Sequence, residues 1–404
     1  MPTFTYTARN RAGARVRSTI VADNRDQAAM RLSAQGLTPE KLVETKTHSA
    51  MKIARLNRRV KSHHLLVFTR QLSTIVSSGL PLMQGLDILA EQAEDPNFAK
   101  IIAAISEEVE SGETFSDSLR KFTRAFPELY VSMVRAGEAG GDLDGVLEQL
   151  ANYLEASEEL RRRIRSAMTY PVVAFSMIIM IAAGLIIFVV PQFAGIFEQM
   201  GGKLPRPTQI LIDISHALRT WQAWAVLIGG AGGLTMFLRV YGKTPSGKYT
   251  LDSLKLRVPI FGMLGRKVAI SRVTRTLSTL TRSGVAILQA MEIVERTAGN
   301  EVYAKAIREA EESVRSGETL AEPLVRAQVF PAMVTRMIAV GEKTGALETM
   351  LAKIADFYDS EVRATVDALT SLIEPLLIGL MGVVVGFIVL ALFMPIFTMT
   401  QLVQ

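Results

Sequence analysis

Three stretches of this sequence lack any charged residue over a length that matches the apolar core of a lipid bilayer. They lie between Arg165 and Glu198, between Arg219 and Arg239, and after Glu374. Because a helix needs about 20 predominantly apolar residues to cross a bilayer, each stretch predicts one transmembrane helix. The predicted transmembrane helices cover residues 170–192, 220–238 and 371–396.

The rest of the composition fits soluble domains joined by these spans. The chain has 404 residues, of which 49% are hydrophobic and 21% are charged. It contains no cysteine, which excludes disulfides and cysteine nucleophiles, and only four histidines. His63 and His64 are adjacent and point to different faces of a helix, so they are poorly placed to bind one metal ion. We expect no catalytic residue, no cofactor and no metal site.

The net charge of +6 is concentrated in two basic segments, residues 52–61 and 161–165. The second segment directly precedes the first predicted span, where positive charge is typical of the cytoplasmic side. This pattern favours a membrane surface over nucleic acid as the partner of the basic residues. It also predicts a cytoplasmic N-terminus and a C-terminus on the outer side of the membrane.

The sequence contains an internal duplication, with an offset of 205 residues that becomes 204 after a one-residue deletion. At the offset of 205, residues 70–79 correspond to 275–284, and 111–114 to 316–319. At the offset of 204, Phe126-Pro127 corresponds to Phe330-Pro331, Pro171 to Pro375, and Pro191 to Pro395. Each repeat therefore predicts a soluble helical bundle followed by a span bracketed by two prolines. Their separation corresponds to about 30 Å of helix, one hydrocarbon thickness.

The duplication constrains the number of spans. Two tandem repeats with one span each would place their soluble bundles on opposite sides of the membrane. A further span at 220–238, outside the repeats, returns the chain and puts both bundles in the cytoplasm. For this reason we predict a span there, although Gly229–Gly233 includes four glycines.

The predicted fold class is an all-α membrane protein with a small N-terminal α+β module. Residues 1–44 predict a ββαβ module, with strands at Phe4–Ala8, Arg15–Val21 and Lys41–Glu44 and a helix at Asn24–Gln35. Apolar residues at helical spacing predict about six helices in each duplicated bundle. The predicted domains are the module at 1–44, a basic linker at 45–62, bundles at 63–169 and 239–370, an outer loop at 193–219 and a tail at 397–404.

The motif Gly-Glu-x-x-Gly-x-Leu occurs once in each repeat. Its residues are Gly137, Glu138 and Gly141 in the first copy, and Gly341, Glu342 and Gly345 in the second. Its second glycine suits a sharp exit from a helix, so one interpretation is a turn between helices. The other is that Glu138 and Glu342 contact a partner, because a turn alone does not require a carboxylate. Nothing in the sequence pairs them as an acid and a base.

The third span carries two further features. Glu374 precedes Pro375 at its start, where a carboxylate is costly unless it pairs or reaches the membrane surface. Gly382 and Gly386 have the GxxxG spacing that allows another helix to approach closely. The partner helix is the first span, another subunit or a client protein.

Residues 242–249 fit the phosphate-loop pattern G-x-x-x-x-G-K but place Tyr249 where a serine or threonine must bind Mg²⁺. The segment also follows a predicted span rather than a strand. We interpret it as a basic turn at the membrane surface.

Together these features resemble the type IV pilus inner-membrane platform protein and the closely related type II secretion system F protein. The residues that carry the resemblance are the two Gly-Glu motifs, Thr169-Tyr170-Pro171, Val190-Pro191-Gln192-Phe193 and Leu372-Ile373-Glu374-Pro375. The resemblance covers essentially the whole chain and separates the two branches poorly.

The resemblance implies a non-enzymatic platform in the bacterial inner membrane. Its expected partners are a cytoplasmic hexameric assembly ATPase, with a retraction ATPase as a further candidate, the transmembrane helices of pilins or pseudopilins, and other inner-membrane subunits of the machine. A homo-oligomer, with a dimer favoured, is also expected. A secondary transporter and a membrane receptor are weaker alternatives, because the spans carry no charge at their centres and the outer segments are short.

Overall fold

The computed structural model describes residues 3–9, 15–21, 25–34, 38–44, 58–199, 205–259 and 261–400. The chain divides into two compact units, residues 1–151 and 152–404. Each unit is described by itself. Residues 45–57 of the predicted linker at 45–62 and residues 401–404 of the predicted tail at 397–404 lie outside the described residues.

The N-terminal segment forms a three-stranded sheet with one helix. Its described elements are β1 (Thr3–Arg9), β2 (Arg15–Val21), α1 (Arg25–Ala34) and β3 (Thr38–Glu44). The strand order is β2-β1-β3, and both pairs are antiparallel. Strand β3 begins three residues before the predicted start and pairs Pro39 with Ala8, next to a shift in register. A proline donates no ladder hydrogen bond, so it is tolerated on an edge strand beside such an irregularity.

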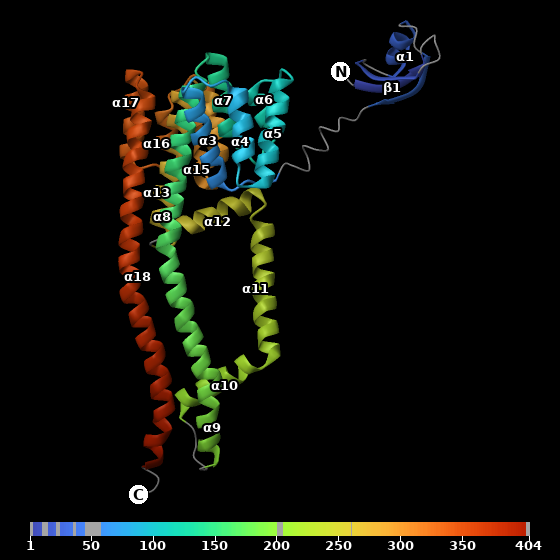
Figure 1. Cartoon of the computed structure of the whole chain (residues 1–404). Helices are drawn as coiled ribbons and strands as arrows, with labels where there is room; N and C mark the ends of the chain where they lie inside the picture. The colour runs from blue at the N-terminus through green and yellow to red at the C-terminus, as the bar shows by residue number, and fades with distance from the viewer. Residues whose placement is uncertain are drawn as a thin grey trace. The chain divides into compact units, whose positions relative to one another are not determined.

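Helices α3 to α8 follow in the first repeat, which continues from the first unit into the second (Figure 1). Their bounds are α3 (Ser62–Ser77), α4 (Leu82–Gln92), α5 (Pro96–Glu110), α6 (Phe115–Arg120), α7 (Glu128–Gly140) and α8 (Leu143–Gly184). Local caps set several of these bounds. Asp95 accepts hydrogen bonds from the N–H groups of Asn97 and Phe98, and Thr114 accepts one from Asp117.

The second repeat has the same order of elements. Helix α12 (Pro245–Arg257) precedes it, and its helices are α13 (Phe261–Arg282), α14 (Ile287–Thr297), α15 (Glu301–Arg315), α16 (Ala321–Arg326), α17 (Ala332–Thr344) and α18 (Leu347–Thr400). Turn glycines with positive φ recur at matched positions, with 83° at Gly79 and 79° at Gly284, and 71° at both Gly141 and Gly345. The duplication seen in the sequence is therefore also present in the backbone.

The cores of the two bundles share an aromatic pair at equivalent positions. Phe98 packs against Phe126 with ring centroids 6.1 Å apart, and Tyr303 packs against Phe330 at 5.3 Å. All four side chains are buried. Burial raises the pKa of Tyr303 to about 12, so its hydroxyl stays protonated at neutral pH.

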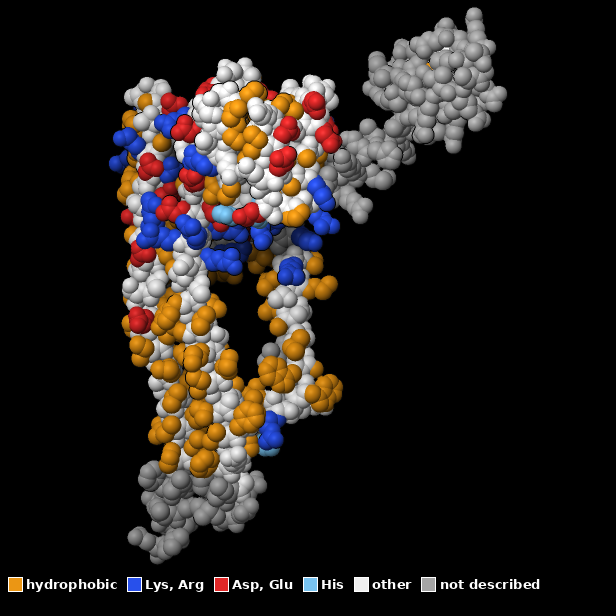
Figure 2. Space-filling model, in the orientation of Figure 1, with side chains coloured by type: hydrophobic (Ala, Val, Ile, Leu, Met, Phe, Trp, Pro, Cys, Tyr) orange, Lys and Arg blue, Asp and Glu red, His pale blue; other side chains and the backbone are white. Residues whose placement is uncertain are grey.

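Three helices among the described residues are long and apolar enough to cross a membrane. The first is α8 with its continuation, the second is α11 (Trp221–Tyr241) and the third is α18. Figure 2 shows hydrophobic side chains covering the lower parts of α8 and α18 and much of α11. The repeat spans thus belong to helices of 42 and 54 residues that begin in the bundles.

Pro191 accounts for a local change in the first span. A π-helical turn, η1 (Leu185–Val189), separates α8 from α9 (Val190–Gln199). Proline lacks the N–H that would bond to the carbonyl four residues earlier, and its ring clashes with that carbonyl. The wider turn before Pro191 accommodates this loss.

The segment predicted as an outer loop is helical where it is described. It contains α9 and α10 (Arg206–Arg219), and α10 packs against the ends of the first and third spans. Leu211 is buried against Val190 and Ile388, and the Thr208 hydroxyl donates a 2.5 Å hydrogen bond to the carbonyl of Ala391. This cluster joins the two repeat spans at the end away from the second bundle.

Truncation of the equivalent aromatic residues should destabilise the bundles. Phe126→Ala and Phe330→Ala each remove a buried ring, and such truncations cost about 3–5 kcal/mol. We expect a lower unfolding temperature for either variant of the full chain in detergent. Val340→Ala, at a side chain that is 52% exposed, is the control. Unchanged unfolding in both phenylalanine variants would contradict this description of the cores.

Candidate functional site

The two Gly-Glu turns have the same backbone geometry. Gly141 directly follows helix α7 and Gly345 directly follows helix α17, each with φ of 71°. The N–H of Asp142 donates to the carbonyl of Gly137, and the N–H of Ala346 donates to that of Gly341, both at 2.9 Å. This bond runs from the residue after the left-handed glycine to the carbonyl five residues earlier, which defines a Schellman turn. Glycine adopts the left-handed conformation without steric cost.

The first glycine of each motif allows two helices to approach closely. A Cβ on Gly137 would lie 3.0 Å from Val146, and a Cβ on Gly341 would lie 2.9 Å from the Cα of Leu347. Both glycines are buried. A side chain here would therefore push the long helix, α8 or α18, away from the helix before it.

The carboxylates of the motif bind the beginning of a neighbouring helix. Glu138 accepts hydrogen bonds from the N–H groups of Phe115 and Ser116, at 2.6 and 2.9 Å. Glu342 accepts from the N–H groups of Leu320 and Ala321, at 2.7 and 3.3 Å. The first turn of a helix has N–H groups without intrahelical partners and carries partial positive charge. A carboxylate therefore stabilises it both by accepting hydrogen bonds and by its negative charge.

These hydrogen bonds explain why the turn contains a glutamate in both repeats. All four donor residues are buried, and both carboxylate side chains belong to half-buried residues. Sequence reasoning missed this role, although one signal was present: the Ser-Gly-Glu-Thr segment precedes the motif at nearly the same distance in both repeats. The predicted contact of Glu138 and Glu342 with a partner stays a prediction.

In the third span, Gly382, Gly386 and Glu374 are not covered by neighbouring side chains among the described residues. Neither Gly382 nor Gly386 has another side chain within 4 Å of the position a Cβ would take. The GxxxG pair therefore does not contact the first span within the described residues. Glu374 is exposed on α18, and Pro375 lies within that helix.

The first span, like the third, contains a proline inside a helix. Pro171 is buried and lies inside α8, so it does not mark the beginning of a helix. Pro191 lies in α9 after the π-helical turn, and Pro395 lies in α18. Pro171, Pro375 and Pro395 are thus accommodated within long helices, whereas Pro191 is the second residue of the short helix α9.

The segment that resembles a phosphate loop is the turn between α11 and α12. Thr244 accepts a hydrogen bond from the N–H of Gly247 and caps α12. Lys248 forms a 2.7 Å ion pair with Glu301. A Cβ on Gly247 would lie 2.0 Å from the carbonyl oxygen of Tyr241, so this glycine serves tight packing against the end of α11.

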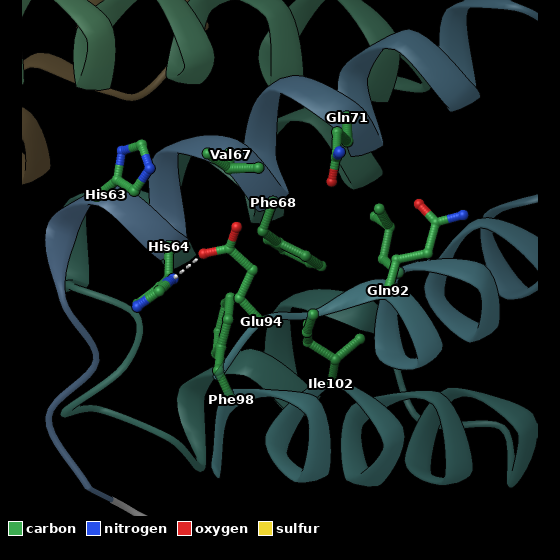
Figure 3. Close-up of a pocket in the computed structure, with 11 residues that line it drawn as sticks. His63, His64, Val67, Phe68, Gln71, Gln92, Glu94, Phe98 and Ile102 are labelled. Carbon is green, nitrogen blue, oxygen red and sulfur yellow. Dashed lines mark ion pairs between the residues drawn. The ribbon is translucent and has the colours of Figure 1, made fainter. Parts of the chain in front are cut away.

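A small cavity of about 120 Å³ lies beside the two histidines in the first bundle (Figure 3). His64 Nδ1 is 4.0 Å from a carboxylate oxygen of Glu94, whereas His63 points away from that carboxylate. In the described part of the chain, no group of three or more histidine and acidic residues could hold a metal ion. Phe68 and Phe98 supply apolar lining to the cavity.

Removal of the capping carboxylates should destabilise each bundle. Glu138→Ala and Glu342→Ala leave two N–H groups of buried residues without acceptors, which costs about 1–3 kcal/mol. Glutamine keeps one acceptor and should cost less. Denaturant unfolding of the full chain, with the exposed Glu148→Ala as control, measures the effect. Wild-type stability in both alanine variants would leave the carboxylates free for a partner.

Comparison with known proteins agrees with this duplicated arrangement. The family model described as type II secretion system protein F matches residues 68–191 and 273–395, and that of its N-terminal domain matches residues 1–42. The two longer matches begin 205 residues apart and end 204 apart, as do the internal repeats.

Three relatives match over nearly their whole length. The type IV pilus assembly protein PilC of Thermus thermophilus is 43% identical, with 98% of each chain covered. PilC of Myxococcus xanthus is 39% identical, covering 99% of this chain and 96% of the relative. The type II secretion system protein F of Vibrio cholerae is 37% identical, with 100% of each covered. The chain belongs to the type II secretion system protein F family, in which the type IV pilus assembly proteins PilC are also found.

Proposed function

We propose that this chain is the non-enzymatic inner-membrane platform of a type IV pilus assembly machine. It couples a cytoplasmic assembly ATPase to the extraction of pilin subunits from the membrane and to their polymerisation. The observation that carries this proposal is the 43% identity to a type IV pilus assembly protein over 98% of both chains. The alternative is the same role for pseudopilins in type II secretion, which the similarity to protein F supports.

The long helices give this proposal a mechanical basis. A helix that begins in a bundle and continues into a span can carry a displacement from one to the other. The second bundle is held to α18 by α13 through three ion pairs: Lys267 with Glu361 at 2.7 Å, Arg275 with Asp356 at 2.7 Å, and Arg275 with Asp359 at 2.5 Å. The Ser271 hydroxyl also donates a hydrogen bond to Asp359.

An apolar cluster continues this contact toward the membrane. Leu264, Val362, Val366 and Leu369 are buried together, with Leu160 and Ile164 of α8 packed against them. Arg163 of α8 pairs with Asp367 of α18 at 2.9 Å. Movement of the second bundle would therefore reach both repeat spans, which is what an ATPase-driven platform requires.

Helix α11 offers a place where a client helix can leave the lipid. Figure 2 shows an open space between α11 and the paired helices α8 and α18. The apolar window of α11 has no buried residue. A pilin's apolar helix must stay out of water as it leaves the bilayer, so a lipid-filled space beside three spans is a suitable exit. The orientation that we propose places both bundles in the cytoplasm and the C-terminus on the outer side of the membrane.

Deletion of the gene should remove surface pili and leave protein secretion unchanged. Wild-type chain should restore pili. Arg275→Gln should leave the chain in the membrane and still bound to the assembly ATPase, yet strongly reduce pilus number, because it breaks both Arg275 ion pairs. Electron microscopy of surface pili, membrane immunoblots and co-purification of the ATPase measure these outcomes.

Arg296→Gln is the matched control, because it alters an exposed pair with Glu292 on the surface of the same unit. Lost secretion with normal pili in the deletion strain would favour the secretion alternative. Normal pili and normal secretion after deletion would contradict the platform role in both forms.

A further inference from the structure

A cavity of about 490 Å³ opens beside the turn between α12 and α13. The end of α12, the first half of α13 and the turn between α14 and α15 line it. The residues that matter for the argument are Lys255, Val258, Phe261, Val268, Arg272 and Asn300. Its lining is largely apolar, with two cationic side chains.

The antiparallel packing of α13 and α18 places this cavity close to the membrane. Arg275 meets Asp356, Lys267 meets Glu361 and Leu264 meets Leu369. As the numbers fall along α13 they rise along α18, so Phe261 lies level with the residues just before Pro375. At 1.5 Å per helical residue, the apolar run of the third span therefore begins within about 10 Å of the Phe261 end of the cavity, and Arg272 lies about 16 Å farther along α13 from the membrane.

The second span also leads to this cavity, through helix α12. Helix α11 ends at Tyr241, and α12 begins four residues later at Pro245. Figure 1 shows α12 lying across the end of α11, beneath the second bundle. A helix that turns aside at the end of a span is placed to lie along the membrane surface.

The surface beside the cavity is unusually apolar for a water-facing helix turn. Four large apolar side chains within ten residues are exposed: Leu254 at 60%, Val258 at 42%, Phe261 at 49% and Met263 at 48%. Their exposure is costly in water and favourable in the outer layer of a bilayer.

One of the two cations that line the cavity has no acidic partner among the described residues. Arg272 is exposed on α13, and its Nη1 lies 2.1 Å from the position that a Cβ on Gly299 would take. Lys255 is 73% exposed and forms a 2.8 Å ion pair with Asp252. Asp252 also accepts a hydrogen bond from the N–H of Glu301, so its charge is shared with the start of α15.

We infer that this cavity binds one anionic phospholipid of the bilayer. Lys255 and Arg272 bind the phosphate, and the acyl chains lie against Val258, Phe261 and Val268. The lipid neutralises Arg272 and covers the exposed apolar side chains, which anchors the second bundle to the membrane surface. This inference rests on the membrane placement given above but not on the pilus role.

Native mass spectrometry of the full chain in detergent tests the inference. We compare the retention of phosphatidylglycerol and phosphatidylcholine with identical acyl chains. One phosphatidylglycerol should bind in preference to phosphatidylcholine. Each basic residue near an anionic membrane surface contributes roughly fivefold in affinity, so the double variant Lys255→Gln, Arg272→Gln should bind it roughly 25-fold more weakly.

Two further variants keep the test specific. Arg282→Gln removes an exposed arginine from the far end of α13 and should retain wild-type binding. Phe261→Ala should weaken the binding of both lipids and keep the preference for the anionic one. All variants are compared after their unfolding temperatures have been shown to match the wild type.

Three outcomes would overturn the inference. They are equal retention of the two lipids, undiminished phosphatidylglycerol binding by the double variant, and full competition by soluble glycerol phosphate, which would indicate a phosphate site without a lipid. Because binding is measured on purified protein, its failure is independent of any failure to assemble pili.

Discussion

The hydrocarbon layer of the membrane is the constraint on which the arrangement of this chain depends. Each repeat brings one soluble bundle and one span, and two such units in tandem would place their bundles on opposite sides. Helix α11 lies between the repeats and has no counterpart in either. In the topology that we propose, it crosses the membrane and returns the chain to its starting side, so both bundles can face the same compartment. A machine that drives both bundles with one cytoplasmic motor requires this arrangement.

The parts that could be predicted are those encoded by local pattern. The second apolar run predicts a span at 220–238, and α11 covers Trp221–Tyr241, because hydropathy and length suffice to find such a helix. The left-handed turns at Gly141 and Gly345 followed from glycine at the end of an apolar helical pattern. The duplication can be detected in the sequence because matched turns and prolines keep a nearly constant spacing.

The parts that could not be predicted depend on contacts distant in sequence. Glu138 binds N–H groups 22 and 23 residues before it, and no local pattern specifies which helix start a carboxylate will meet. The ion pairs of Arg275 cross more than 80 residues, as does the contact of α10 with α18. The GxxxG spacing at Gly382 suggested a packed interface, whereas both glycines are open, because the spacing permits a close approach and does not supply a partner.

The natural absence of cysteine allows a direct test of the central claim that both bundles share one side of the membrane. Single cysteines at the exposed positions Ser78, Thr220, Ser246 and Ser316 are treated with a membrane-impermeant maleimide in cells with an intact inner membrane, and again after lysis. We expect Thr220→Cys to react in intact cells, and the other three to react only after lysis. Reaction of Ser78→Cys and Ser316→Cys from opposite sides of the membrane would contradict the account.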